Sequence, residues 1–142
     1  TMKTDFKHST TLRVRYGETD QMGYSYYGNY AQYFEVGRVE ALRELGMSYK
    51  SLEDRGIMLP VAHMEVNYKA PALYDDALQI TTHISELKGA RLFFHYEIHV
   101  NEKLISTAST TLVFVAKETM RPISPPEDFI KLFDNYLKRA ND

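Results

Sequence analysis

The sequence predicts an α+β protein in which an antiparallel β-sheet wraps around one long, buried helix. One segment with helical periodicity, residues 29–45, precedes four segments with the alternating pattern of strands. Short turns separate most of these strands, as antiparallel hairpins require. We expect residues 1–142 to form a single domain with a core spanning about residues 10–135, because 142 residues is an ordinary size for one domain.

The N-terminal part predicts a strand, a loop and then the helix. Residues 11–15 alternate apolar and polar side chains, whereas residues 17–28 show no clear periodicity and are expected to form a loop. Asn29 is expected to be the N-cap of the helix and Gly46 its left-handed C-cap. Gly37 lies on the apolar stripe and predicts a close approach to another backbone segment. The stripe consists of Tyr30, Tyr33, Phe34, Gly37, Ala41 and Leu45.

The remaining residues predict the sheet. Strands are expected at residues 61–70, 78–87, 91–100 and 104–115, and an amphipathic terminal helix at residues 126–139. A turn at Gly89 pairs apolar residues across the hairpin, Ile84 with Phe94 and Ile80 with Ile98. A turn at residues 101–103 places small residues opposite large ones, Ser106, Ala108 and Thr110 against Ile98, Tyr96 and Phe94. This arrangement leaves a groove for a helix, and the uncovered sheet edges favour a dimer that joins edge strands.

Composition excludes several classes of protein. A net charge of −2 argues against generic binding of nucleic acid, which requires a basic surface. No apolar run reaches the roughly 18 residues needed to span a bilayer, and the N-terminus lacks the core of a signal peptide. Zero cysteines exclude disulfides, thiolate metal ligands and a cysteine nucleophile. These features predict a cytoplasmic protein.

The side chains best suited to catalysis or ligand binding are concentrated between Tyr16 and Tyr33. Five of the 11 tyrosines fall within residues 24–33, and Asp20 lies in a loop that runs into the start of the helix. The first N–H groups of a helix lack intrahelical partners, so they suit a carbonyl oxygen or an anion. A carboxylate beside such donors can attack or activate water while the donors stabilise an oxyanion. Alternatively, Asp20 is a turn former and the tyrosines are core or dimer contacts.

Two stretches carry a family resemblance. The segment RYGETDQMGYSYYGNYAQYFEVGR resembles the signature of the hotdog-fold acyl-CoA thioesterases of the 4-hydroxybenzoyl-CoA thioesterase/YbgC type. The matching residues, in order, are Tyr16, Glu18, Thr19, Asp20, Gly23, Tyr26, Tyr27, Asn29 and Tyr30. The segment VAHMEVNYKAPALYDDALQI resembles the second family stretch through Tyr68, Pro71 and Asp76. The resemblance implies a hotdog fold that assembles as a dimer, and often as a tetramer of two dimers, with active sites between subunits.

The resemblance also implies roles for individual residues. Asp20 would be the catalytic carboxylate, acting as nucleophile or general base, and the backbone N–H of Tyr27 or Gly28 would polarise the thioester carbonyl. No metal or organic cofactor is implied. Tyr27 departs from many YbgC-type members, which have His there, and a phenol with a pKa near 10 is a poor base. The acyl group is expected to pass Met22, Tyr24 and Tyr30, and the phosphates of coenzyme A to meet Lys88, Arg91 and Arg121.

Other functions remain open from the sequence. The substrate could be carried on an acyl carrier protein instead of coenzyme A, or the chain could be a non-catalytic hotdog dimer that binds an acyl ligand. His83 is expected to face His95 across adjacent strands, but no third metal ligand is evident. Serine hydrolase chemistry is disfavoured, because no serine lies in a Gly-x-Ser-x-Gly motif.

Overall fold

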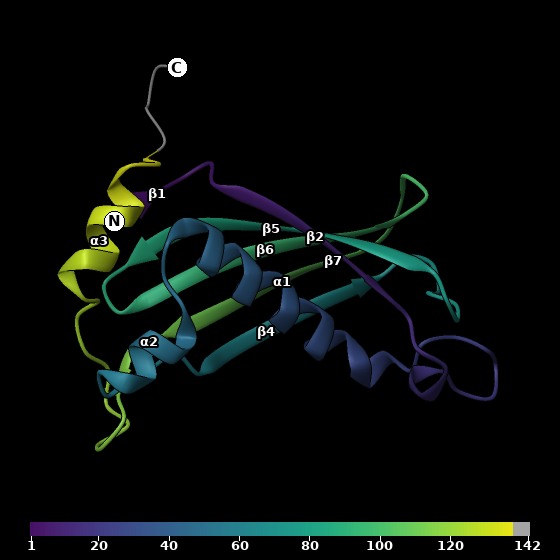
Figure 1. The fold of residues 1–142 in the computed structure, drawn as a ribbon, viewed down its shortest axis with the longest axis horizontal. Helices are drawn as coiled ribbons and strands as arrows, with labels where there is room; N and C mark the ends of the chain where they lie inside the picture. Colours follow the sequence, from purple (N-terminus) through teal and green to yellow (C-terminus); the bar gives the residue numbers. More distant parts are fainter. Residues whose placement is uncertain (138–142) are drawn as a thin grey trace.

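The computed structural model describes residues 1–137 and consists of an antiparallel sheet curved around helix α1 (Figure 1). The sheet has the strand order β1-β5-β6-β7-β4, with β2 also paired to β5. Its strands are β1 (Met2–Lys3), β2 (Lys7–Arg13), β4 (Val61–Tyr68), β5 (Ala77–Lys88), β6 (Arg91–Val100) and β7 (Lys103–Val113). The prediction of an antiparallel sheet wrapped around one long helix is confirmed.

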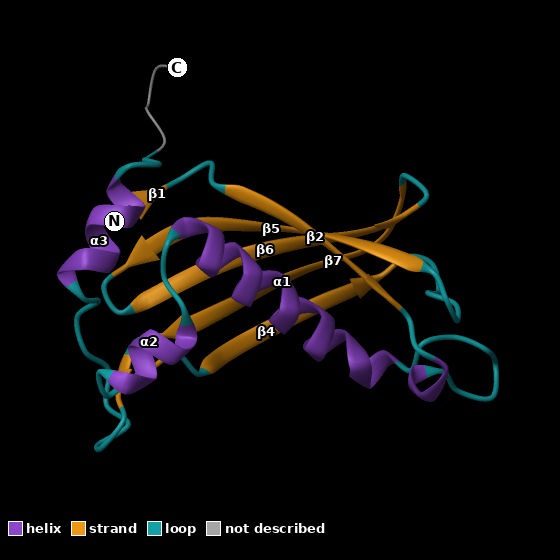
Figure 2. Ribbon diagram, in the orientation of Figure 1, coloured by secondary structure: helices purple, strands orange, loops and turns teal. Residues whose placement is uncertain are grey.

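The helices lie on one side of this sheet (Figure 2). Helix α1 (Tyr30–Leu45) crosses the concave face, and α3 (Glu127–Asp134) lies beside β1 at one end. The short helix α2 (Tyr49–Asp54) follows α1 and precedes a small second sheet of β3 (Ile57–Met58) and β8 (Val115–Ala116). Two 3-10 turns, Tyr16–Glu18 and Tyr27–Asn29, flank the loop that leads into α1.

Both predicted hairpin registers are confirmed. The β5–β6 pair aligns Ile84 with Phe94 and Ile80 with Ile98. The β6–β7 pair aligns Ile98 with Ser106, Tyr96 with Ala108 and Phe94 with Thr110. The large residues of β6 point into the core, and the small residues of β7 beside them leave the space that α1 fills.

At Gly37, α1 comes close to strand β5. A Cβ atom added at this residue would lie 2.7 Å from Thr82 Oγ1 and 2.8 Å from Ile80 Cγ2, which is closer than packing allows. Both contacts come from the inner face of β5, and Thr82 and Ile80 are fully buried. The predicted close approach at Gly37 is therefore confirmed. The predicted left-handed cap at Gly46 is confirmed as well, since its φ is 117°.

Other predicted boundaries were wrong. The first strand spans Lys7–Arg13 instead of 11–15, because its pairing with β5 starts before the alternating pattern becomes visible. The predicted N-cap position of Asn29 is confirmed, but its side chain does not cap α1, because the preceding 3-10 turn already gives it helical backbone angles of φ −74° and ψ −17°. Its Nδ2 instead donates a hydrogen bond of 2.7 Å to the carbonyl oxygen of Glu18. The terminal helix ends at Asp134, and the last positions predicted for it, 138 and 139, lie outside the described residues.

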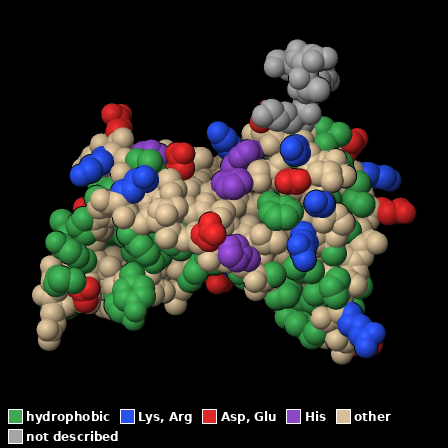
Figure 3. Space-filling model, turned by 180° about the vertical axis from the view of Figure 1, so that it is seen from behind, with side chains coloured by type: hydrophobic (Ala, Val, Ile, Leu, Met, Phe, Trp, Pro, Cys, Tyr) green, Lys and Arg blue, Asp and Glu red, His purple; other side chains and the backbone are tan. Residues whose placement is uncertain are grey.

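The sheet leaves the face away from α1 and the β4 edge without cover. The face away from α1 is mostly polar, with scattered histidines and carboxylates (Figure 3). The edge strand β4 is exposed along nearly its whole length. Exposed apolar side chains on this strand include Val61, Met64 and Tyr68. An exposed edge strand with apolar side chains is a template for pairing with another chain.

The close contact at Gly37 predicts that a single added methyl group lowers the stability of the protein. Gly37→Ala should lower the free energy of unfolding by about 1–3 kcal/mol, because overpacking outweighs the gain of about 1 kcal/mol in helix propensity. Chemical denaturation measures this change. Gly17→Ala is the matched control, because a Cβ at Gly17 meets nothing within 4 Å. A denaturation midpoint raised by Gly37→Ala would contradict the close packing.

Candidate active site

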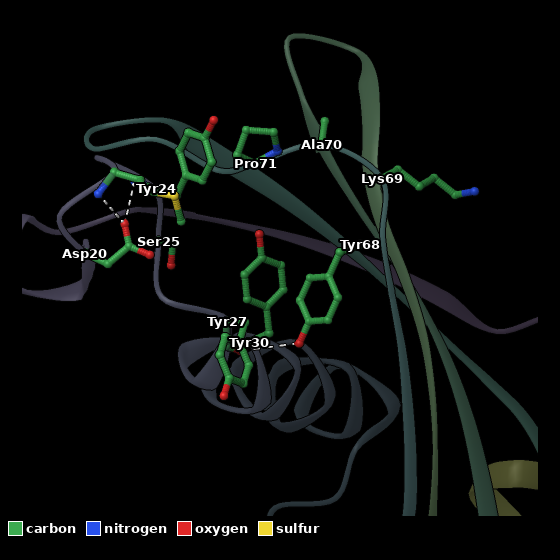
Figure 4. A pocket seen from close by; sticks show the side chains of 10 residues that line it. Asp20, Tyr24, Ser25, Tyr27, Tyr30, Tyr68, Lys69, Ala70 and Pro71 are labelled. Carbon is green, nitrogen blue, oxygen red and sulfur yellow. Dashed lines mark hydrogen bonds between the residues drawn. The ribbon is translucent and has the colours of Figure 1, made fainter.

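A cavity of about 340 Å³ opens at the N-terminal end of α1. Side chains from the loop before α1, from α1 itself and from the segment after β4 form its wall (Figure 4). Asp20 and Tyr24 lie on one side of the cavity and Tyr68 on the other. The lining residues are Asp20, Met22, Tyr24, Ser25, Tyr27, Tyr30, Tyr68, Lys69, Ala70 and Pro71.

The carboxylate of Asp20 is held by the loop that follows it. Its Oδ1 accepts hydrogen bonds from the backbone N–H of Met22 at 2.9 Å and of Tyr24 at 3.3 Å, in the manner of an Asx turn. Gly23 completes this turn with a φ of 79°, a conformation that favours glycine. Within residues 1–137, Oδ2 of Asp20 accepts no hydrogen bond. One carboxylate oxygen is thus fixed by the backbone, and the other is available to a ligand in the cavity.

The start of α1 supplies hydrogen-bond donors to the same cavity. The 3-10 turn Tyr27–Asn29 leads directly into α1, so the N–H groups of Tyr27 and Gly28 precede the first intrahelical hydrogen bonds. In the described part of the chain, neither N–H donates to a protein acceptor. A Cβ at Gly28 would lie 2.5 Å from the ring of Tyr26, so a side chain there would displace this half-exposed ring. The positive end of the helix dipole adds to the attraction of these donors for an oxyanion.

The phenols of Tyr30 and Tyr68 are neutral donors near pH 7, because both have a raised pKa. Burial raises the pKa of Tyr30 above its usual value of 10.0, although a hydrogen bond with the backbone of Ala72 opposes this effect. Burial also raises the pKa of Tyr68, and the neighbouring Tyr27 adds to the rise. The hydroxyl of Tyr68 donates to the carbonyl oxygen of Tyr27 at 3.4 Å. Tyr30 and Tyr68 therefore shape the site and donate hydrogen bonds, but they do not act as bases.

Five of the predicted site residues come together in this cavity. They are Asp20, Met22, Tyr24, Tyr27 and Tyr30, and Gly28 adjoins them in the turn that begins α1. Sequence reasoning gave no role to Ser25, Lys69 or Ala70, which also line the cavity. Lys69 and Ala70 could have been found from the sequence, because they lie between Tyr68 and Pro71 of the second family stretch, which forms the opposite wall. Asp76 of that stretch shapes the adjoining turn, where its Oδ2 accepts a hydrogen bond from the N–H of Leu73 at 2.8 Å.

The three predicted phosphate-binding residues do not lie in the cavity. Lys88 and Arg91 flank the turn between β5 and β6, whereas the cavity lies beyond the opposite end of β5. At about 3.3 Å per residue, the 12 residues of β5 separate the two ends by roughly 36 Å. Arg121 follows β8, where its carbonyl oxygen accepts from the N–H of Ala116. No single subunit therefore brings Lys88, Arg91 or Arg121 to Asp20.

The predicted histidine pair forms but does not extend to a metal site. His83 and His95 are opposite each other in the β5–β6 register, with ring centroids 6.2 Å apart. Among residues 1–137, no three His, Asp or Glu side chains gather closely enough to hold a metal ion. No helix in that range is both long and apolar enough to cross a membrane.

Comparison with known proteins identifies the family. Residues 14–133 match the model of the thioesterase-like superfamily. The chain belongs to this superfamily. It is 31% identical over 131 residues to the acyl-CoA thioesterase YbgC of Haemophilus influenzae, covering 92% of this chain and 96% of the relative.

Solved structures of thioesterases have the same fold. A DHNA-CoA thioesterase from Staphylococcus aureus superposes with a TM-score of 0.88 at 34% identity, covering 91% of this chain and 89% of that one. The gentisyl-coenzyme A thioesterase BH1999 superposes with a TM-score of 0.81 at 25% identity, covering 87% and 99% of the two chains. The predicted hotdog fold and the predicted class of enzyme, a thioester hydrolase, are both confirmed.

Proposed function

We propose that the chain hydrolyses acyl-CoA thioesters to a free carboxylic acid and coenzyme A, with Asp20 as the catalytic carboxylate. The observation that supports this most directly is the cavity itself, which is lined both by Asp20 and by Tyr27 of the turn that begins α1. A thioesterase needs these two elements, a group that attacks or activates water and donors that stabilise the oxyanion.

The proposed reaction begins with the thioester carbonyl at the start of α1. Its oxygen accepts a hydrogen bond from the N–H of Tyr27 or Gly28, which polarises the carbonyl and stabilises the negative charge of the tetrahedral intermediate. As a general base, Asp20 takes a proton from water while the water oxygen bonds to the carbonyl carbon. The C–S bond then breaks as Asp20 returns this proton to the sulfur, so coenzyme A leaves as its thiol and the carboxylate is restored.

Asp20 can alternatively act as the nucleophile. Its carboxylate oxygen then bonds to the acyl carbon, the C–S bond breaks, and the departing thiolate is protonated to the thiol. Water hydrolyses the resulting anhydride and restores the carboxylate. The Oδ2 atom suits either role, because only Oδ1 is engaged by the loop backbone. Neither route requires a metal or an organic cofactor.

Coenzyme A is the proposed carrier of the acyl group, because the relatives named above act on coenzyme A thioesters by name. An acyl carrier protein would need a docking surface beside the cavity, which no observation assigns. Lys69 is the cation that lines the cavity, and its side chain extends away from the tyrosines (Figure 4). We assign Lys69 to the phosphates of coenzyme A. Lys88, Arg91 and Arg121 could meet them only from a second subunit.

We further propose that two copies pair through their β4 edges, as a homodimer that could assemble further into a tetramer. The edge is exposed over Val61–Tyr68, and Tyr68 belongs both to this strand and to the cavity wall. Pairing here would continue the sheet across the two subunits and cover the apolar side chains of β4. It would also close the side of the cavity beside Tyr68, so the reaction would occur at the interface.

The role of Asp20 is tested by the removal of its charge. Asp20→Asn should reduce thiol release from acyl-CoA substrates by at least about a thousandfold, because an amide neither attacks nor takes the proton. A panel of short, long and aromatic acyl-CoAs with a thiol reagent measures the activity and the substrate preference together. Asp75→Asn is the matched control, because Asp75 is exposed and its φ of 67° is tolerated by asparagine. Equal turnover in Asp20→Asn and wild type would refute the role of Asp20.

The β4 interface is tested by a charged substitution. Met64→Lys should shift the protein from dimer toward monomer and lower its activity, because a lysine on the paired edge is poorly accommodated. Thr11→Lys on the exposed face of β2, at the other side of the sheet, is the control. Light scattering coupled to size exclusion measures the mass. A dimer of unchanged stability in Met64→Lys would place the interface elsewhere.

A further inference from the structure

We propose that Tyr33 is a positioning residue for Asp20, acting through hydrogen bonds to both ends of the loop that carries this carboxylate. The inference rests on the proposed function, since it assigns Tyr33 a part in the reaction of Asp20. Tyr33 lies one turn inside α1 and does not line the cavity. Its ring belongs to the apolar core, and only its hydroxyl reaches the loop.

The contacts form a linear network, Ser25–Tyr33–Glu18. The hydroxyl of Tyr33 donates to Oε1 of Glu18 at 3.1 Å. It lies 2.8 Å from Oγ of Ser25. Because a phenol has a single proton, the serine hydroxyl is then the donor to Tyr33. Glu18 precedes Asp20 by two residues and Ser25 follows it by five, so one side chain of α1 holds both ends of the loop.

Each end of the network is itself anchored. Glu18 Oε1 also accepts from the N–H of Arg15 at 2.8 Å, and the carbonyl oxygen of Glu18 accepts from the N–H of Tyr26 at 2.8 Å. The N–H of Ser25 donates to the carbonyl oxygen of Ala72 at 2.6 Å. Residues 20–24 lie between these two anchors and are tied to one another, since the N–H of Asp20 donates to the carbonyl oxygen of Tyr24 at 2.8 Å. Their Asx turn fixes Asp20 relative to α1 only if both anchors keep their places.

The position of the hydroxyl argues for a role beyond core packing. Tyr33 is 2% exposed and its neighbour Phe34 is fully buried, so a phenylalanine ring would satisfy the same apolar stripe. A buried hydroxyl is unfavourable unless it is hydrogen-bonded, and both partners of this one lie on the Asp20 loop. Burial raises the pKa of Tyr33 to about 12, so the hydroxyl keeps the proton that it donates to Glu18 at every pH at which the enzyme would work.

The experiment removes the hydroxyl and retains the ring. Tyr33→Phe should lower kcat by about ten- to a hundredfold while KM stays within about threefold, because a misplaced carboxylate slows the reaction without removing the surface that binds substrate. Tyr96→Phe is the matched control. Tyr96 is also a buried tyrosine, and its hydroxyl lies 2.6 Å from Oγ1 of Thr110, away from the Asp20 loop. It should lower the melting temperature at least as much and leave kcat within twofold.

A second comparison separates this inference from the proposed function. In an Asp20→Asn background, Tyr33→Phe should cause less than a twofold further loss, because the residue that it positions no longer reacts. An inactive Asp20→Asn with a fully active Tyr33→Phe would overturn the positioning role alone. Full activity of Asp20→Asn would overturn both. Equal loss of kcat in Tyr33→Phe and Tyr96→Phe would contradict the positioning role, because the loss would then follow from lower stability alone.

If Tyr33→Phe does not fold, Ser25→Ala removes one hydrogen bond of the network and is expected to show the same split, with kcat lowered and KM nearly unchanged.

Discussion

The close packing of α1 against the sheet is the constraint on which the rest of the structure depends. Gly37 allows the helix backbone to approach β5, and the small residues of β7 beside the large residues of β6 provide the groove. A helix held this closely cannot slide along its axis, so its first turn stays at one end of the sheet. The turn Tyr27–Asn29 that begins α1 thereby stays at the end of the sheet where the cavity lies. Core packing and the candidate chemistry are therefore two consequences of one contact.

The loop before α1 holds the carboxylate of Asp20 in the same cavity without a hydrogen bond to the N–H groups of Tyr27 and Gly28. Asp20 is retained by N–H groups of its own turn, those of Met22 and Tyr24, which leave one oxygen available. The ends of the loop are bound to α1 through Tyr33, so the loop and the helix form one unit. A preorganised site of this kind needs little rearrangement when charge develops on a substrate oxygen.

Features that depend on short stretches of sequence could be predicted. The hairpin registers followed from turns at Gly89 and residues 101–103, and the close packing of α1 on the sheet followed from Gly37. The family signature identified the loop around Asp20. Elements of two residues, such as β3, carry no periodicity and could not be foreseen. The sequence pattern placed Tyr33 on the apolar stripe of α1 and gave its hydroxyl no role. Its hydrogen-bond partners lie eight and fifteen residues away in the sequence, so no local pattern reveals them. The charges at Lys88 and Arg91 looked suitable for phosphate, but a pattern does not reveal which end of a strand faces the site.

The proposed reaction requires the helix start and Asp20 to act on the same carbonyl group. The structure of Asp20→Asn with a bound acyl-CoA tests it most directly. We expect the thioester carbonyl oxygen to lie about 2.7–3.1 Å from the N–H nitrogen of Tyr27 or Gly28, with the side chain of residue 20 next to the carbonyl carbon. A thioester bound in the cavity with its carbonyl directed away from the start of α1, or bound outside the cavity, would contradict it.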